Sequence, residues 1–95
     1  MSGSKVIYRA HAVRRMFERK ITEFEILEVL RAGKIIEDYP TDQPYPSRLL
    51  LGFVKARPLH LVMAEAKKLS AIIIITVYEP DLETWESGFE VRKKP

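Results

Sequence analysis

The chain has 95 residues, a net charge of +3 and no cysteine. This length allows one small domain covering residues 1–95, and the lack of cysteine excludes disulfides, thiolate catalysis and cysteine-ligated zinc. Six basic residues lie among the first twenty positions with a single acidic one, which favours a polyanionic partner such as nucleic acid or an acidic protein. Because there is no long apolar run and no signal-like start, we expect a cytoplasmic protein that does not enter a membrane. Residues 1–4 have the composition of a flexible leader.

Residues 10–20 have the pattern of a first helix. Three basic side chains follow one another at four-residue steps: His11, Arg15 and Arg19. On a helix such steps drift by about 40° each, so these side chains form one cationic stripe. The apolar residues expected to pack on the core are Val13, Met16 and Phe17.

The second helix has a clear start. Thr22 can act as its N-cap, Glu25 completes a capping box three residues later, and Ile21 can contact Ile26 in a hydrophobic staple. Gly33 is expected to end the helix in the left-handed conformation. The two helices are therefore joined by a very short connection.

After Gly33 the pattern changes to that of strands. Strands are expected at residues 35–39, 47–54, 59–64 and 71–78, after a short extended stretch at residues 6–8. Pro40 ends the first of them, residues 41–46 form a loop, and residues 55–58 form a hairpin turn. Residues 81–95 are expected to cross the sheet edge, with a flexible tail at 93–95. The predicted fold is α+β: two N-terminal helices packed on a twisted antiparallel sheet of about four strands.

Three polar residues fall on the last two strands. Because side chains alternate along a strand, His60 shares a face of its strand with Val62 and Ala64, and Thr76 shares a face with Tyr78. If these strands are neighbours, His60, Thr76 and Tyr78 lie close together and can transfer protons near neutral pH. The alternative is structural: a hydrogen-bonded sheet histidine, an aromatic residue at a strand end and a β-forming threonine.

The cationic stripe also has two interpretations. Two arginines aimed at one place imply a phosphate or carboxylate between them. Otherwise the face is simply solvated, with Arg14 pairing Glu18 and His11 serving as a helix N-cap. Two distant histidines, no cysteine and no paired carboxylates at ligand spacing argue against a metal site. The groups present suit metal-free RNA transesterification.

Five segments occur in order along the chain: HAVRRMFERKI, GKIIEDYP, PYPSRLLLG, RPLHLV and IITVYEP, followed by Trp85. Over residues 10–92 this series resembles the bacterial domain-of-unknown-function 4258 family. The resemblance implies a RelE-like fold in the barnase/EndoU/colicin/RelE class of metal-independent ribonucleases. The family's recurrent polar positions fall on His11, Arg15, Arg19, His60, Thr76 and Tyr78, and Trp85 and Arg92 match its C-terminal signature. One departure is Ala56, where the family usually has glycine.

We therefore expect a metal-independent endoribonuclease toxin of a bacterial toxin–antitoxin system, which cleaves mRNA without a cofactor, either free or on the ribosome. The expected catalytic residues are His60, Tyr78 and His11, and the expected substrate-binding residues are Arg15, Arg19, Thr76 and Arg92. The resemblance implies a cognate antitoxin, either an acidic protein or a YgiT-type zinc-finger protein. The alternatives are a non-enzymatic RNA- or protein-binding module of the same fold and a stand-alone α+β domain of housekeeping or phage origin.

Overall fold

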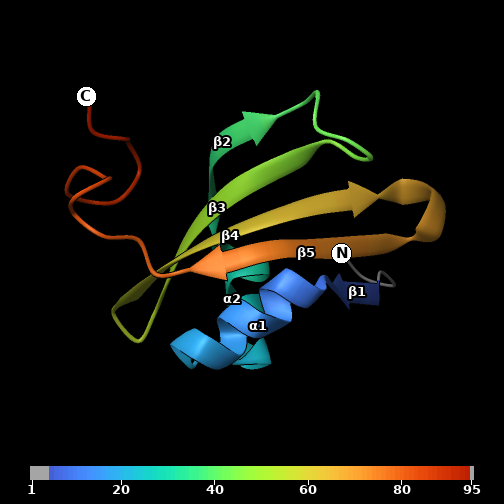
Figure 1. The fold of residues 1–95 in the computed structure, drawn as a ribbon, viewed down its shortest axis with the longest axis horizontal. Helices are drawn as coiled ribbons and strands as arrows, with labels where there is room; N and C mark the ends of the chain where they lie inside the picture. Colours follow the sequence, from blue (N-terminus) through green and yellow to red (C-terminus); the bar gives the residue numbers. More distant parts are fainter. Residues whose placement is uncertain (1–4, 95) are drawn as a thin grey trace.

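The computed structural model describes residues 5–94, which form two helices and one five-stranded sheet (Figure 1). The elements in chain order are β1 (Lys5–Tyr8), α1 (Ala10–Arg19), α2 (Glu23–Ala32), β2 (Lys34–Tyr39), β3 (Ser47–Val54), β4 (Arg57–Ala66), the 3-10 turn η1 (Lys67–Leu69) and β5 (Ala71–Tyr78). The strand order is β1-β5-β4-β3-β2. Among residues 5–94, no helix is both long enough and apolar enough to span a membrane.

The α+β prediction is confirmed, but the expected sheet of about four antiparallel strands is wrong in two respects. The extended stretch predicted at residues 6–8 is a fifth strand, β1, and it pairs with β5 in the parallel sense. The other neighbouring strands are antiparallel. Parallel partners need a long connection between them, and here α1, α2 and three strands separate β1 from β5. Strand β5, which carries a run of four isoleucines at residues 72–75, lies inside the sheet between β1 and β4.

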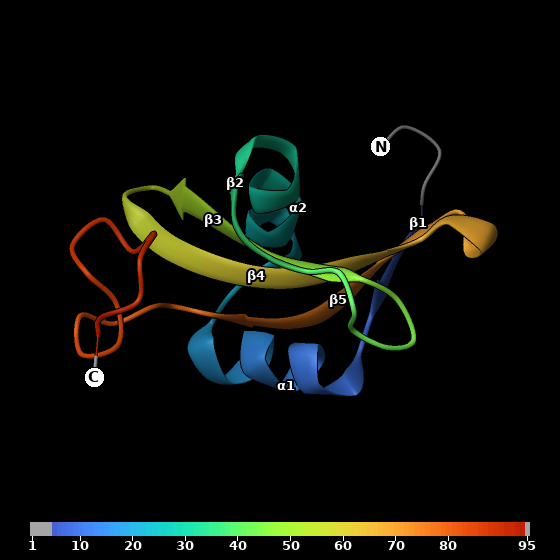
Figure 2. The ribbon, with the colours of Figure 1, turned by 90° about the horizontal axis from the view of Figure 1, so that it is seen from above.

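One face of the sheet, the helix face, carries the main hydrophobic core. Leu50, Leu61 and Val77 lie side by side across β3, β4 and β5, and they belong to one buried cluster with residues of both helices. In Figure 2, α1 runs along β5, and α2 lies against β3 and β4. Gly52 permits the close approach of α2, because an added Cβ there would lie 2.8 Å from Cγ2 of Val29.

The predicted start of α2 is confirmed, and its predicted end is wrong. The Thr22 hydroxyl accepts a hydrogen bond from the Glu25 backbone N–H at 3.1 Å, and the Glu25 carboxylate accepts one from the Thr22 N–H at 2.8 Å. Gly33, however, is extended rather than left-handed, with φ −72° and ψ 161°. The chain enters β2 directly at Lys34, so it must extend at this point. Position 33 requires glycine because there is no room for a side chain, not because of its backbone conformation: a Cβ there would lie 2.4 Å from the Val29 carbonyl oxygen.

The β3–β4 hairpin has a two-residue loop, Lys55 and Ala56, between the paired residues Val54 and Arg57. Both loop residues have positive φ, 53° and 66°, as in the type I′ turns that match the strand twist. Strand β4 therefore begins two residues before the predicted residue 59 and includes Pro58.

The predicted core-facing side of α1 is largely wrong. Val13 is exposed and Phe17 is 88% exposed, whereas the fully buried residue is the small Ala12. Met16 is half-buried against the core. Residues three and four apart share a helix face, and both Ala12 and Val13 are spaced in this way from Met16. The apolar spacing was therefore compatible with more than one orientation of α1 against the sheet.

The N-terminal end of α1 and the C-terminal tail also differ from expectation. The helix begins at Ala10 with Arg9 as its N-cap residue, so His11 lies within the first turn and is exposed. The Lys93 backbone N–H donates to the Thr84 carbonyl at 2.9 Å, which ties down part of the tail predicted to be flexible. The predicted leader, residues 1–4, lies outside the described residues, as does residue 95.

Candidate functional site

The face of the sheet opposite the helices, the open face, gathers the polar strand residues predicted to lie together. His60 on β4 pairs in register with Tyr78 on β5, and Val62 pairs with Thr76. Thr76 and Tyr78 alternate along β5, so both share this face with His60. The expected juxtaposition of His60, Thr76 and Tyr78 is therefore present.

His60 is completely buried, and its two ring nitrogens have different partners. Nε2 lies 2.8 Å from the Phe89 carbonyl oxygen, which can only accept, so Nε2 carries the proton. Nδ1 lies 3.2 Å from the Tyr78 hydroxyl and, in the neutral ring, accepts a hydrogen bond from it. Burial lowers the pKa of His60, against the opposing effects of the Phe89 carbonyl and of the Glu37 charge. The imidazole is therefore neutral at pH 7, with one tautomer selected by its neighbours.

A C-terminal strap, residues 79–94, leaves the end of β5 and loops beside the ends of the strands in Figure 1, and its contacts reach His60 on β4 and Glu37 on β2. Trp85 of the strap is 2% exposed and meets the His60 ring edge-on, with the ring centroids 4.4 Å apart. The Arg92 guanidinium lies over the Trp85 ring at 4.6 Å. Arg92 Nε and Nη2 donate to the two carboxylate oxygens of Glu37 at 2.9 and 3.1 Å. The strap thus closes over His60 and places a cation at the edge of the site.

Two residues of β2, Glu37 and Tyr39, complete the group, and neither is among the site residues expected from the sequence. The Tyr39 hydroxyl donates a hydrogen bond to Glu37. The guanidinium of Arg92 holds the pKa of Glu37 below its usual range, and burial together with this hydrogen bond raises the pKa of Tyr39. The open-face cluster consists of Glu37, Tyr39, His60, Tyr78, Trp85 and Arg92.

The position of Glu37 depends on an irregularity in β2. Ile35 pairs with Leu50 on the helix face, but Glu37 pairs with Leu49 on the open face, because the register shifts between Ile35 and Glu37. Regular alternation would put both on the same side, and the acidic Glu37 at a strand end has the pattern of a solvated residue. A bulge of this kind leaves no clear mark in a single sequence.

The cationic stripe does not join this cluster. α1 packs on the helix face, where Ala12 shares the buried core with Leu61. His60 precedes Leu61 and points to the opposite face of β4. The structure therefore separates His11, Arg15 and Arg19 from His60. Arg15 Nη1 lies 3.8 Å from Glu18, so the predicted Arg14–Glu18 pair is replaced by an Arg15–Glu18 pair.

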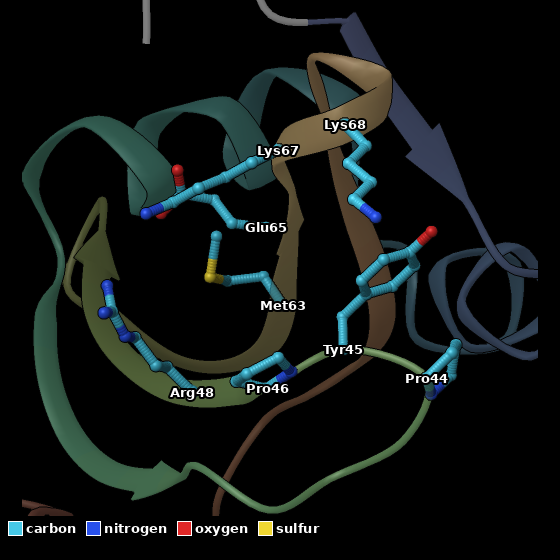
Figure 3. Close-up of a pocket in the computed structure, with 8 residues that line it drawn as sticks. All are labelled: Pro44, Tyr45, Pro46, Arg48, Met63, Glu65, Lys67 and Lys68. Atoms are coloured by element: carbon cyan, nitrogen blue, oxygen red, sulfur yellow. The ribbon is translucent and has the colours of Figure 1, made fainter.

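A separate hollow of about 660 Å³ lies where the loop between β2 and β3 meets β4 and η1 (Figure 3). Tyr45, Met63 and three cationic residues are among its lining residues, with Arg48 on one side of Met63 and Lys68 beside Tyr45. None of the residues that line it belongs to the open-face cluster.

The model of a protein family described as Domain of unknown function (DUF4258) matches residues 8–79. The chain belongs to this family. No curated protein and no solved structure matches it. The resemblance to the DUF4258 family is confirmed over this span.

The DUF4258 match divides the open-face cluster into two parts. Glu37, Tyr39, His60 and Tyr78 lie within the matched residues, whereas Trp85 and Arg92 lie beyond them on the strap. The matched span of this chain therefore contains the carboxylate, the imidazole and the two phenols, and the strap adds the guanidinium and the indole that covers the imidazole.

The open-face cluster brings a tyrosine hydroxyl and an imidazole together on one sheet face, with a fixed cation at its edge. Tyr78 is half-buried, and burial raises its pKa, so its hydroxyl stays protonated at neutral pH and donates a hydrogen bond to Nδ1 of His60. Arg92 keeps an exposed side-chain fraction of 53%, so an anion can approach its guanidinium.

Proposed function

We propose that the protein is a metal-independent endoribonuclease with a RelE-like fold, the toxin of a bacterial toxin–antitoxin pair, and that it cleaves mRNA by transesterification from the 2′-hydroxyl. The observation that supports this proposal most is the open-face cluster, which combines an imidazole, two phenols, a carboxylate and an arginine on one sheet face. These are the groups that metal-free cleavage of RNA requires: a base, an acid and a cation for the charged phosphorane.

The base in this proposal is a relay in which Tyr78, not His60, meets the RNA. His60 is completely buried and its Nε2–H is committed to the Phe89 carbonyl, so it has no route to a substrate atom. The Tyr78 oxygen accepts the 2′-hydroxyl proton while its own proton moves to Nδ1 of His60. This revises the expected role of His60 from the substrate-facing base to the proton acceptor behind Tyr78.

The remaining roles fall on the β2 side of the cluster. The 2′ oxygen attacks phosphorus, the bond to the 5′ oxygen breaks, and the leaving oxygen takes a proton from Tyr39, whose raised pKa keeps it protonated. Arg92 holds the phosphate, the role expected from the sequence, and Thr76 contributes a hydroxyl on the same face. The product is a 2′,3′-cyclic phosphate. Arg15 and Arg19 lie too far from this face to hold the scissile phosphate and contribute long-range attraction for RNA.

A second candidate function is favoured by one specific observation, the complete burial of His60 beneath Trp85. In this alternative the cluster is structural, His60 fastens the strap to the sheet, and the domain binds RNA or protein without cleaving it. Binding of labelled RNA without any product would support this second function.

The test uses purified protein and end-labelled RNA in excess EDTA, with and without ribosomes. Cleavage should persist in the chelator, and Tyr78→Phe should slow it by about 10²-fold or more, because a positioned acid or base contributes that much. The control is Tyr45→Phe, a tyrosine of the separate hollow, which should cleave like the parent protein. Unchanged cleavage by Tyr78→Phe, or loss of cleavage in EDTA, would contradict the mechanism.

The toxin assignment has its own test. Induction of the chain in a bacterium should arrest growth, and coexpression of the protein encoded by the adjacent reading frame, an acidic or YgiT-type zinc-finger antitoxin, should relieve the arrest. Growth arrest that persists in Tyr78→Phe would separate toxicity from RNA cleavage.

A further inference from the structure

An apolar groove of about 550 Å³ runs along α1 to the start of α2, on the side of the molecule that the proposed reaction does not use. Its apolar lining residues are Tyr8, Val13, Met16, Phe17 and Ile21. Phe17 is 88% exposed and Val13 is 52% exposed. A phenyl ring loses a large area of contact with water when it is covered, so a ring this exposed beside a groove marks a contact surface.

The groove is bordered by positive charge. Val13 and Phe17 are four residues apart and share a face of α1, and Lys20, the C-cap residue that follows the helix, also lines the groove. Arg14 is three residues from Phe17, and Arg9 is four residues from Val13. Within residues 5–94, neither of these arginines nor Lys20 forms an ion pair.

The acidic residue in the groove is already engaged. Glu23 lines one end, and its carboxylate accepts a hydrogen bond from the Tyr8 hydroxyl at 2.9 Å. The surface offered to a partner is therefore an apolar strip with unpaired cations along it.

We infer that this groove binds an amphipathic helix of a partner protein, whose apolar side covers Phe17 and Val13 and whose acidic residues pair with the bordering cations. This binding mode lays the i, i+4 and i+7 apolar residues of one helix into a groove of another protein. A second copy of the chain fits the charge poorly, because two α1 helices face to face would oppose their basic residues. RNA fits the apolar strip poorly, because it offers few polar groups to base edges.

The suggestion that the partner is an inhibitory antitoxin rests on the proposed function. Binding of an acidic helix to the groove is measured without RNA, so failure of binding and failure of cleavage are separate results. Phe17 lies outside the open-face cluster, and Phe17→Ser should cleave RNA at the same rate as the parent protein.

The experiment titrates the full chain into a fluorescent amphipathic peptide of about 20 residues, long enough to form a helix, with leucines on one face and glutamates on the other. A matched peptide carries lysines in place of the glutamates. We expect the acidic peptide to bind and the basic peptide not to bind. Phe17→Ser should weaken binding about tenfold or more, because an anchoring aromatic residue carries much of the energy of such a contact.

The matched control is Phe53→Ser, since Phe53 is 57% exposed but lies on β3. It should bind the acidic peptide like the parent protein. Circular dichroism of Phe17→Ser should be unchanged, because this side chain is outside the core. Equal binding of both peptides, or equal loss in both phenylalanine variants, would overturn the proposal.

Sedimentation and RNA titration of the same variants test whether the groove is instead occupied by a second copy of the chain or by RNA. A dimer of the chain that dissociates in Phe17→Ser would assign the groove to a second copy. Binding of single-stranded RNA that is lost in Phe17→Ser would assign the groove to nucleic acid. Either result would overturn the proposal of an acidic helix.

Discussion

Acidification should destabilise the folded protein through His60. Burial lowers the pKa of this imidazole in the folded state, whereas an unfolded histidine titrates near about 6.5. The unfolded chain therefore binds a proton more readily, and protonation favours unfolding. The neutral imidazole of His60 makes its full contribution to the stability of the folded protein above about pH 6.5. This contribution is lost as the pH falls from about 6.5 towards the pKa of His60 in the folded state.

The size of the effect is limited by a single proton. One proton bound on unfolding gives a slope of at most about 1.4 kcal/mol per pH unit. For a domain of this size, about 1 kcal/mol corresponds to a shift of roughly 4–8 °C in Tm. Arg92 lowers the pKa of Glu37 in the folded state, so the contribution of this carboxylate to stability is lost only near and below its usual unfolded pKa of about 4.3. The change in stability between pH 5 and 7 therefore reports on His60.

The assay is urea unfolding at several pH values between 5 and 7, followed by the fluorescence of Trp85, the single tryptophan, which is buried against His60. His60→Gln should remove the pH slope. His11→Gln is the matched control, because His11 is exposed, and it should keep the slope. A slope that survives in His60→Gln, or stability that rises on acidification, would show that protonation of His60 does not set the pH dependence of stability.

Three further predictions concern the fold and are measured by urea unfolding at pH 7. Ala56→Gly should raise the free energy of unfolding by about 0.5–1 kcal/mol, because Ala56 holds φ 66° where glycine is unstrained; a loss would argue against the left-handed turn. Gly52→Ala should lower it by about 1–3 kcal/mol through a clash with Val29, and adding Val29→Ala should cost less than the two single effects combined. Thr22→Ala should lower it by about 1 kcal/mol and Thr22→Ser should restore it, if the capping box contributes as observed.

The parts of the fold that could be predicted are those set by local chemistry. The capping box at Thr22 and Glu25 is a contact between neighbours in sequence, so the start of α2 was predictable. Alternation along β4 and β5 also placed His60, Thr76 and Tyr78 on one face, given that the two strands are adjacent.

The parts that could not be predicted depend on distant or irregular contacts. The exposure of Phe17 follows from packing α1 on β5 through Ala12, which local periodicity does not specify. Glu37 reaches the open face through a register shift, and Arg92 reaches Glu37 because the strap crosses the sheet. Only the structure shows that the carboxylate of Glu37 belongs to the candidate site and that the cationic stripe on α1 does not.

The proposed function depends on cleavage of RNA through its own 2′-hydroxyl at the open face, without a metal ion. The most direct measurement is the chemistry of the 3′ ends produced by the full chain in EDTA, with one RNA and a matched RNA whose 2′-hydroxyl at the cleaved position is replaced by hydrogen. We expect a 2′,3′-cyclic phosphate from the first RNA and no cleavage of the second at that position. No product, 3′-hydroxyl ends, or cleavage at the deoxy position would contradict it.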